Sequence, residues 1–209
     1  GAYCGLFLAE ARKRGWDAEG VEPSRWACRI ARERFGVAVH PGTVETAAKT
    51  LSPPYDAVVA WDVLEHVRDP QALLDQARGL LGPGGLLCFS TLDAGSPYAR
   101  IMGRHWPWLM DMHLFYFTRP LLVRWLDRAG FDVVEIADYR HYATLPYLWS
   151  KAAAMLPSPL GRAVGPLARL LPSSWVIPVS LGDVVLVVAR RKTAAASTGR
   201  MFIAALVGG

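Results

Sequence analysis

Two glycines open the sequence, and an acidic residue follows them at a distance that suits a nucleoside site. Gly1 and Gly5 come directly before a stretch of helical apolar spacing at 6–13, and Glu22 closes the strand candidate that follows. A glycine loop leading into a helix lets backbone amides approach a ligand closely. A carboxylate at the end of the strand that follows this helix can accept hydrogen bonds from both hydroxyls of a ribose. Turn glycines and solvated carboxylates are common, so this pattern needs support from the rest of the chain.

A second group suited to chemistry is His113, in an aromatic-rich connection at 93–117. Connections of this length are usually lids or binding loops. An imidazole titrates near physiological pH and can take the proton of a hydroxyl group, although His113 could equally order the loop by bonding to its backbone. The aromatic residues of the connection could form an acceptor pocket or serve as core anchors: Trp106, Trp108, Phe115 and Tyr116. The place of His66 just after the strand at 55–61 favours a structural or pocket-edge role. The remaining histidines do not have the spacing of metal ligands, so no metal site is expected.

Strand and helix patterns alternate along the chain and would position these residues. The run at 57–60 suits a strand buried on both faces of a parallel sheet. Alternation of this kind indicates βαβ units, hence an α/β fold with a parallel sheet and helices on both faces. The expected strands lie at 17–21, 37–40, 55–61, 86–90, 131–137 and 184–189, and the expected helices at 6–13, 24–35, 69–81 and 118–129.

Four segments in this order resemble the motifs of class I S-adenosylmethionine-dependent methyltransferases. They are GAYCGLF at 1–7, GVEPS at 20–24, YDAVVAWDVLEHV at 55–67 and LLGPGGLL at 80–87. The resemblance covers residues 1–131, and 182–190 is similar to the final strand of that family. It implies a Rossmann-like, doubly wound, mostly parallel sheet with S-adenosylmethionine as the cofactor.

The resemblance also implies roles for individual residues. The backbone of the glycine loop would contact the methionine part of the cofactor, with Tyr3 standing where the commoner motif has its middle glycine. An acidic residue after the strand at 17–21 would bind the ribose, and the segment after the strand at 37–40 would flank the adenine. The end of the strand at 55–61 would line the pocket beside the substrate. In order along the chain, the implied residues are Gly1, Ala2, Tyr3 and Gly5, then Glu22 and Pro23, then Thr43 and Val44, and finally Trp61 and Asp62.

Methyl transfer to a small-molecule, glycan or lipid-linked acceptor is the function that this resemblance implies, with an oxygen acceptor as one form. A sulfonium donor leaves as a neutral thioether, so positioning can supply most of the rate, and His113 is the expected base for a hydroxyl acceptor. The alternative is a noncatalytic module that keeps the fold and contacts a membrane or an anionic partner. A nicotinamide-dependent oxidoreductase is a further alternative. Nucleic-acid methylation is disfavoured, because no Asn-Pro-Pro-Tyr-like motif follows the strand at 55–61.

Composition sets the remaining limits. The chain has 209 residues, a net charge of +5 and a pI near 9.3, but its basic residues are scattered, as on solvated helix faces. Cys4, Cys28 and Cys88 are too far apart for a zinc motif and odd in number for a disulfide framework, which favours a reducing, cytoplasmic location. No run reaches the length of a membrane span. The sequence does not indicate an oligomeric state.

The chain is expected to form one domain at 1–191, followed by a tail of linker composition at 192–209. A proline-rich helical insert at 145–181 could contact a membrane surface peripherally or cover an apolar acceptor, although packing against its own domain is favoured. The family's sheet has a central strand before the glycine loop, and this sequence lacks it. Its loss predicts a gap of about 10 Å between the neighbouring strands, or their re-pairing. Either outcome would weaken cofactor binding by the chain as given.

Overall fold

A computed structural model describes residues 1–154 and 156–193. Of the predicted tail, residues 194–209 lie outside the described part. A four-stranded sheet forms the centre, in the order β3 (Tyr55–Ala60), β4 (Leu81–Leu92), β8 (Val184–Arg191) and β5 (Phe131–Asp138). β3 and β4 are parallel, whereas β8 runs antiparallel to both of its neighbours. In the described part of the chain, no helix is long and apolar enough to cross a membrane.

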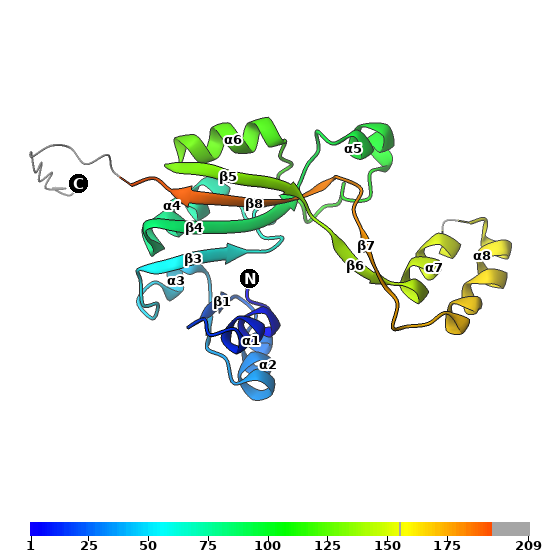
Figure 1. Cartoon of the computed structure of the whole chain (residues 1–209), viewed down its shortest axis with the longest axis horizontal. Coiled ribbons are helices and arrows are strands. Elements are labelled where there is room, and N and C mark those ends of the chain that lie inside the picture. Colours follow the sequence, from blue (N-terminus) through cyan, green and yellow to red (C-terminus); the bar gives the residue numbers. More distant parts are fainter. Residues whose placement is uncertain (155, 194–209) are drawn as a thin grey trace, which may run out of the picture.

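The main core lies between this sheet and two amphipathic helices, α4 (Pro70–Leu80) and α6 (Arg119–Arg128) (Figure 1). Proline at the first turn and a cap from Asp69, whose carboxylate accepts from the Ala72 amide at 2.9 Å, explain where α4 begins. Both helices contribute leucines to one cluster with the buried side chains of β4, β5 and β8. Its largest fully buried members include Leu74, Leu87, Phe89, Leu122, Leu126, Phe131, Val185 and Val187.

The N-terminal elements form a second, smaller cluster around a separate pair of parallel strands, β1 (Gly20–Glu22) and β2 (Val39–Pro41). Helices α1 (Leu6–Lys13) and α2 (Arg25–Phe35) pack against them. Gly5 is required at the start of α1, because its φ is 78° and an added Cβ would lie 2.6 Å from the Val37 side chain. The sequence therefore places a glycine where the loop, α1 and α2 meet.

Of the two outcomes expected for the strands beside the glycine loop, separation or re-pairing, the structure shows that they do not pair with each other. Among the described strands, β1 pairs only with β2 and β3 pairs only with β4, so the two sheets remain separate. A polar cluster links them: the Tyr55 hydroxyl at the start of β3 donates to the Glu19 carboxylate, and His40 of β2 lies 2.6 Å from the same carboxylate. Burial and the bond to Glu19 raise the pKa of Tyr55 to about 12, so this hydroxyl remains a donor at ordinary pH.

Two long excursions leave the sheet at the edge where β3 and β4 end. The first is the aromatic segment 93–117, with α5 (Pro97–Met102) and the short helix η1 (Gly103–His105). The second is an arm at 139–182, which begins after β5 and returns into β8. It is formed by β6 (His141–Thr144), α7 (Leu145–Ala154), α8 (Ser158–Val164), the short helix η2 (Gly165–Leu170) and β7 (Val176–Val179).

The arm differs from the expectation that the insert packs against its own domain. β6 and β7 form an antiparallel ribbon, and this ribbon carries the helices of the arm away from the central sheet (Figure 1). The strands β6 and β7 were not predicted, since Pro178 and the proline-rich surroundings argue against regular strands.

Candidate functional site

Glu22 is held directly against the glycine loop. Its side chain is buried, at 9% exposure, and its two carboxylate oxygens accept from the backbone amides of Tyr3 and Ser24, each at 2.9 Å. Tyr3 has a positive φ of 45°, and its ring is 65% exposed, so a side chain is accommodated at this loop position by pointing into solvent. The carboxylate is thus oriented by two charge-assisted bonds to the chain around it.

The turn after β3 reaches the same place. A Cβ added to Gly1 would lie 3.5 Å from the Val63 side chain and 3.9 Å from the Glu22 carboxylate. The Trp61 ring meets Phe7 of α1 edge to face, with the ring centroids 5.7 Å apart. Gly1, Glu22 and the turn at 61–63 therefore converge, and the cofactor-binding role expected for Gly1, Glu22, Trp61 and Asp62 stays a prediction.

Asp62 has strained backbone at this point, with a φ of 50°. A reciprocal pair of bonds supports it: the Asp62 amide donates to the Ser90 hydroxyl at 2.9 Å, and that hydroxyl donates to the Asp62 carboxylate at 2.6 Å. Non-glycine residues in this conformation cluster at functional sites, where the surrounding structure compensates for the strain. Ser90 was not singled out from the sequence, because a serine inside a strand carries no local signal.

Thr43 and Val44 directly follow Gly42, which is hydrogen-bonded to Glu22. The Gly42 amide donates to the Glu22 carbonyl at 3.0 Å, which places the start of α3 (Val44–Ala47) beside the end of β1. Thr43 caps this helix in a reciprocal capping box with Thr46. Pro23 follows Glu22 and is exposed. All the residues predicted to bind the cofactor thus surround the ends of β1, β2 and β3.

These residues fit a nucleoside cofactor. Each Glu22 oxygen accepts one backbone N–H, and a carboxylate oxygen has two lone pairs, so each keeps acceptor capacity for a ribose hydroxyl. The amides of Ala2, Tyr3 and Gly5 already bond within the chain, so the N–H groups open to a ligand are those of the first turn of α1, which directly follows the loop. The arrangement can therefore orient a ribose from one side and a polar chain from the other.

His113 lies against the residues that follow β3, although the two segments are far apart in sequence. Its Nδ1 is 2.7 Å from the Trp108 carbonyl, and Nδ1 of His66 is 3.0 Å from the Met112 carbonyl. Because a carbonyl only accepts, we assign the proton of each ring to Nδ1, which leaves Nε2 as the acceptor. The ring centroids of His66 and His113 are 4.8 Å apart. The Leu114 amide also donates to the Glu65 carbonyl, at 2.7 Å.

Glu65 completes this group and was missed in the sequence. Its side chain is 1% exposed and accepts from the Thr91 hydroxyl at 2.9 Å. One ligand atom from each of Glu65, His66 and His113 lies within 4.8 Å of the others. By donor type the three could hold a divalent transition-metal ion, and they could also pass a proton. The only sequence signal for Glu65 was its place after a buried strand.

Replacing Glu65 with glutamine should stabilise the protein at neutral pH. Burial raises the pKa of Glu65 above its ordinary value of 4.5, so its contribution to stability is complete below that pH and is lost as the pH rises through the folded-state pKa. Glutamine keeps an acceptor for Thr91 without the charge. Thermal unfolding followed from pH 4 to 8 should show a gain that grows with pH. The exposed Glu33→Gln is the control, and a Glu65→Gln variant less stable than wild type at neutral pH would contradict this expectation.

The aromatic segment is anchored by a buried carboxylate. Trp106 and Trp108 both donate their indole N–H groups to one oxygen of Asp183, each at 2.9 Å, and Asp183 is 4% exposed. The Tyr116 hydroxyl donates to the Trp108 carbonyl at 3.2 Å. Phe115 instead lines a hollow with Phe117, Leu121 and Trp125. The two tryptophans are therefore anchors, and the four predicted aromatic residues do not line one pocket.

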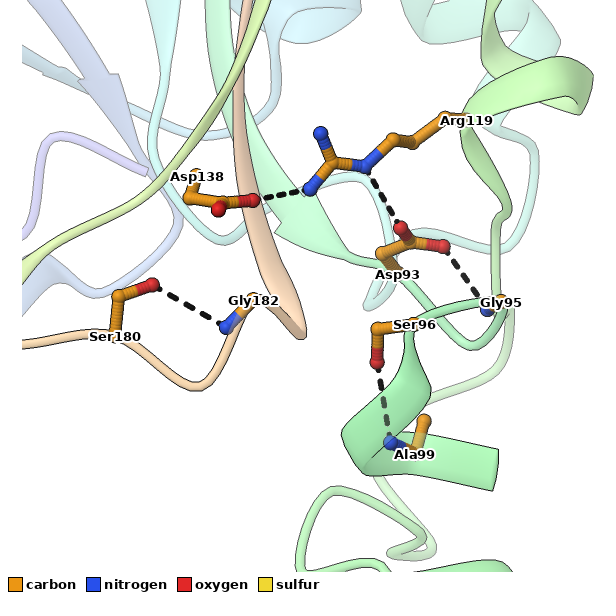
Figure 2. Close-up of polar contacts among 8 residues, drawn as sticks. All are labelled: Asp93, Gly95, Ser96, Ala99, Arg119, Asp138, Ser180 and Gly182. Atoms are coloured by element: carbon orange, nitrogen blue, oxygen red, sulfur yellow. Dashed lines mark hydrogen bonds and ion pairs between the residues drawn. The ribbon is translucent and has the colours of Figure 1, made fainter. Parts of the chain in front are cut away.

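Arg119 joins the bases of the two excursions (Figure 2). Its Nε donates at 2.9 Å to Asp93, the first residue of the aromatic segment. Its Nη2 donates to Asp138, the last residue of β5 before the arm. Asp93 also accepts from the Gly95 amide at 2.9 Å. The bond to Asp138, together with that to Asp93, raises the pKa of Arg119. One guanidinium thus fixes both segments at the edge that holds the candidate site.

Comparison with known proteins assigns the family. Residues 1–136 match the family model described as a methyltransferase domain. The chain belongs to this methyltransferase family. The match supports the predicted class I fold and S-adenosylmethionine as the cofactor, and it replaces the nicotinamide-dependent alternative.

Curated relatives are similar to part of the chain. The ubiquinone biosynthesis O-methyltransferase of Alkalilimnicola ehrlichii is 35% identical over 94 residues, covering 43% of this chain and 38% of that protein. The enzyme of the same name from Pectobacterium atrosepticum is 32% identical over 136 residues, covering 59% of this chain and 56% of the relative. The chain therefore spans less than two thirds of the length of these relatives.

Solved structures show the same fold at low identity. A SAM-dependent methyltransferase from Thermotoga maritima aligns with a TM-score of 0.54 and 22% identity, covering 92% of this chain and 79% of that one. A SAM-dependent methyltransferase from Archaeoglobus fulgidus aligns with a TM-score of 0.57 and 18% identity, covering 91% and 83%. The predicted α/β Rossmann-like architecture is confirmed.

Proposed function

We propose that the protein transfers a methyl group from S-adenosylmethionine to a hydroxyl oxygen of a small-molecule, glycan or lipid-linked acceptor. The observation that carries the proposal is the buried Glu22 carboxylate, oriented by the glycine loop and by the amide of Ser24. The names of the curated relatives, which are ubiquinone biosynthesis O-methyltransferases, support oxygen as the acceptor atom. A lipid-linked acceptor would require contact with a membrane surface, and 145–181 is the segment we propose for it.

The cofactor would supply an electrophilic methyl group on a positively charged sulfur. In this proposal the loop at 1–5 orients the methionine part and Glu22 holds the ribose. Thr43 and Val44 flank the adenine, and the strained turn at Trp61 and Asp62 closes the side toward the acceptor. The chain's main contribution is to hold donor and acceptor in line, because such alignment can replace much of the activation free energy.

His113 is the group that we propose receives the acceptor's proton. With Nδ1 bonded to the Trp108 carbonyl, its Nε2 is available to a hydroxyl group on the acceptor, beside Glu65 and His66. Nε2 of His113 would take the proton of the acceptor hydroxyl, and the bound cofactor would supply the methyl group for that oxygen.

Replacing His113 with alanine should lower kcat by about 100-fold or more, since general bases typically contribute 10²–10⁴-fold. The affinity for S-adenosylmethionine should stay unchanged. The exposed His105→Ala serves as the control. If His113→Ala keeps the wild-type kcat, His113 only orders the loop.

The proposed function itself is tested by calorimetric titration with S-adenosylmethionine, followed by transfer of an isotope-labelled methyl group to catechols, simple phenols and hydroxylated polyprenyl compounds. Saturable binding and label in one of these acceptors support it. Binding without transfer to any acceptor would favour the noncatalytic module, and failure to bind the cofactor would overturn the proposal.

A further inference from the structure

In the arm at 139–182, the exposed side chains include many large apolar ones, and the buried side chains are small. Among its described residues the buried side chains are Ala153 and Ala168, and an added Cβ on Gly161 would lie 2.5 Å from the Ala153 carbonyl. Most of the large apolar side chains of the arm are exposed instead, whereas a few, such as Leu148 and Val164, are partly buried. Those exposed by more than a third are Tyr142, Tyr147, Trp149, Leu156, Leu160, Leu167, Leu170, Trp175, Val176, Ile177 and Leu181. A soluble domain normally buries such residues, so this distribution marks an interaction surface.

The charge of the arm has one sign. From Tyr139 to Gly182 the sequence contains no aspartate or glutamate, whereas the chain as a whole contains 18. The basic residues of the arm are Arg140, Lys151, Arg162 and Arg169, and they lie on its surface. Within the described residues, none of them forms a salt bridge with a carboxylate. The scattered positive charge noted in the sequence is thus unopposed on this part of the molecule.

The base of the arm is joined to the edge of the sheet that holds the candidate site. It leaves the sheet after β5 and returns into β8, at the edge where β3 and β4 end and where Asp62 and Glu65 lie. Arg119 binds Asp138 at its base, and the Tyr139 amide donates to the Val184 carbonyl at 2.9 Å. Figure 1 shows the ribbon of β6 and β7 extending from this edge.

We propose that the arm docks on the surface of a bilayer containing anionic phospholipids. Tryptophan and tyrosine favour the interface between headgroups and acyl chains, leucines enter the boundary, and exposed basic residues bind lipid phosphates. The absence of acidic residues favours a negatively charged surface over a protein partner of mixed charge. Docking would leave the protein on one side of the membrane, with the site's edge of the sheet facing the headgroups.

The acceptor class follows if the proposed function holds. A protein docked by the arm would receive its acceptor from the lipid phase, as a hydroxyl on a lipid-linked molecule. Docking itself needs neither cofactor nor methyl transfer, so the two proposals fail separately.

Vesicle sedimentation with the complete protein tests the docking. Phosphatidylcholine vesicles are compared with vesicles that also contain phosphatidylglycerol, at low and at high salt. We expect binding to the anionic vesicles, weakened by salt because the phosphate contacts are screened. Equal sedimentation with both vesicle types would overturn the electrostatic part, and no sedimentation with either would overturn the proposal.

Paired variants locate the surface. Arg162→Gln with Arg169→Gln should lower the partition coefficient by about fivefold for each side chain removed. Leu170→Ser with Trp175→Ser should lower it by about tenfold or more, since both residues would lose their apolar anchorage. Arg29→Gln with Arg34→Gln on α2 and Ile101→Ser on α5 are the matched controls, because these residues are exposed outside the arm.

Two further measurements distinguish membrane docking from a damaged fold and from self-association. Calorimetric binding of S-adenosylmethionine should be unchanged in the arm variants, which shows that the fold and the cofactor site persist. Sedimentation velocity without vesicles should give the same mass for wild type and Leu170→Ser with Trp175→Ser. A wild-type dimer that becomes a monomer in this variant, together with no vesicle binding, would assign the arm to self-association and overturn the membrane proposal.

Discussion

Replacing Glu22 with alanine should lower the affinity for S-adenosylmethionine by about 100-fold or more. The change removes the proposed acceptor for the ribose hydroxyls, and hydrogen bonds to a charged group contribute about 1.5–3 kcal/mol each. It also leaves the amides of Tyr3 and Ser24 without the partners that now hold the glycine loop at the end of β1. Loss of a ligand contact and loss of loop order act in the same direction.

Calorimetry on Glu22→Gln separates these two contributions. Glutamine offers one carbonyl oxygen in place of two carboxylate oxygens, so it can order part of the loop and accept from one hydroxyl. Its affinity should fall between those of wild type and Glu22→Ala. The control is Glu10→Gln, an acidic residue on α1 whose carboxylate pairs with Lys13 and Arg14. If both Glu22 variants bind as tightly as wild type, the cofactor site lies elsewhere.

The separation of β1 and β3 calls for a second comparison. The glycine loop bonds to β1 through the Ala2 amide, which donates to the Val21 carbonyl, and it lies beside Val63 after β3, while in the described structure no strand lies between the two sheets. Binding should therefore be measured on the chain as given and on one preceded by an added β-strand-forming segment. Stronger binding by the extended chain, abolished by Glu22→Ala in both, would show that strand pairing supports the loop.

The sequence predicted the elements whose signals are local. A glycine at Gly5 before the first helix, a serine cap at Ser24 and the strand β3 each depend on a few neighbouring residues, and each appears where it was expected. The expected burial of β3 on both faces is wrong: none of its residues is buried, and Val59 is 39% exposed, because β3 lies at the edge of its sheet and pairs only with β4. The order of four motifs then indicated the fold. Strand ends were less accurate: β4 begins at Leu81, five residues before its predicted start at 86, because its pairing with Tyr55 of β3 extends through the glycines.

Contacts between distant segments could not be predicted. Asp183 accepts from two tryptophans more than 70 positions earlier, and Glu65 meets His113 across the aromatic segment. Such pairings depend on where the sheet brings two chain segments together, and no periodicity encodes them. The arm was misjudged for a related reason: its composition is apolar enough for a core, and only the structure shows that most of its large side chains are exposed.

Replacing Asp183 with alanine should destabilise the protein by about 3 kcal/mol, because it leaves the buried indole donor of Trp106 and the partly buried one of Trp108 without an acceptor, at about 1–3 kcal/mol each. Asp183 also stands directly before β8, and its carbonyl accepts from the Asp93 amide at 2.8 Å. The side chain therefore fixes the tip of the aromatic segment to the same strand end that holds its base. Denaturant unfolding gives the free energy, and hydrogen exchange at 106–117 reports the local loosening.

Intermediate changes decide whether the carboxylate or the space it fills is responsible. Asp183→Asn keeps an oxygen acceptor and should cost about 1 kcal/mol, while Trp108→Phe removes one donor and should cost less than Asp183→Ala. The exposed Asp56→Ala should have no effect on stability. In Asp183→Ala, kcat should fall because the Trp108 carbonyl orients His113, while cofactor affinity is kept. Equal losses of kcat and cofactor affinity would instead show that the aromatic segment supports the whole site, and His113 would then have no separate role.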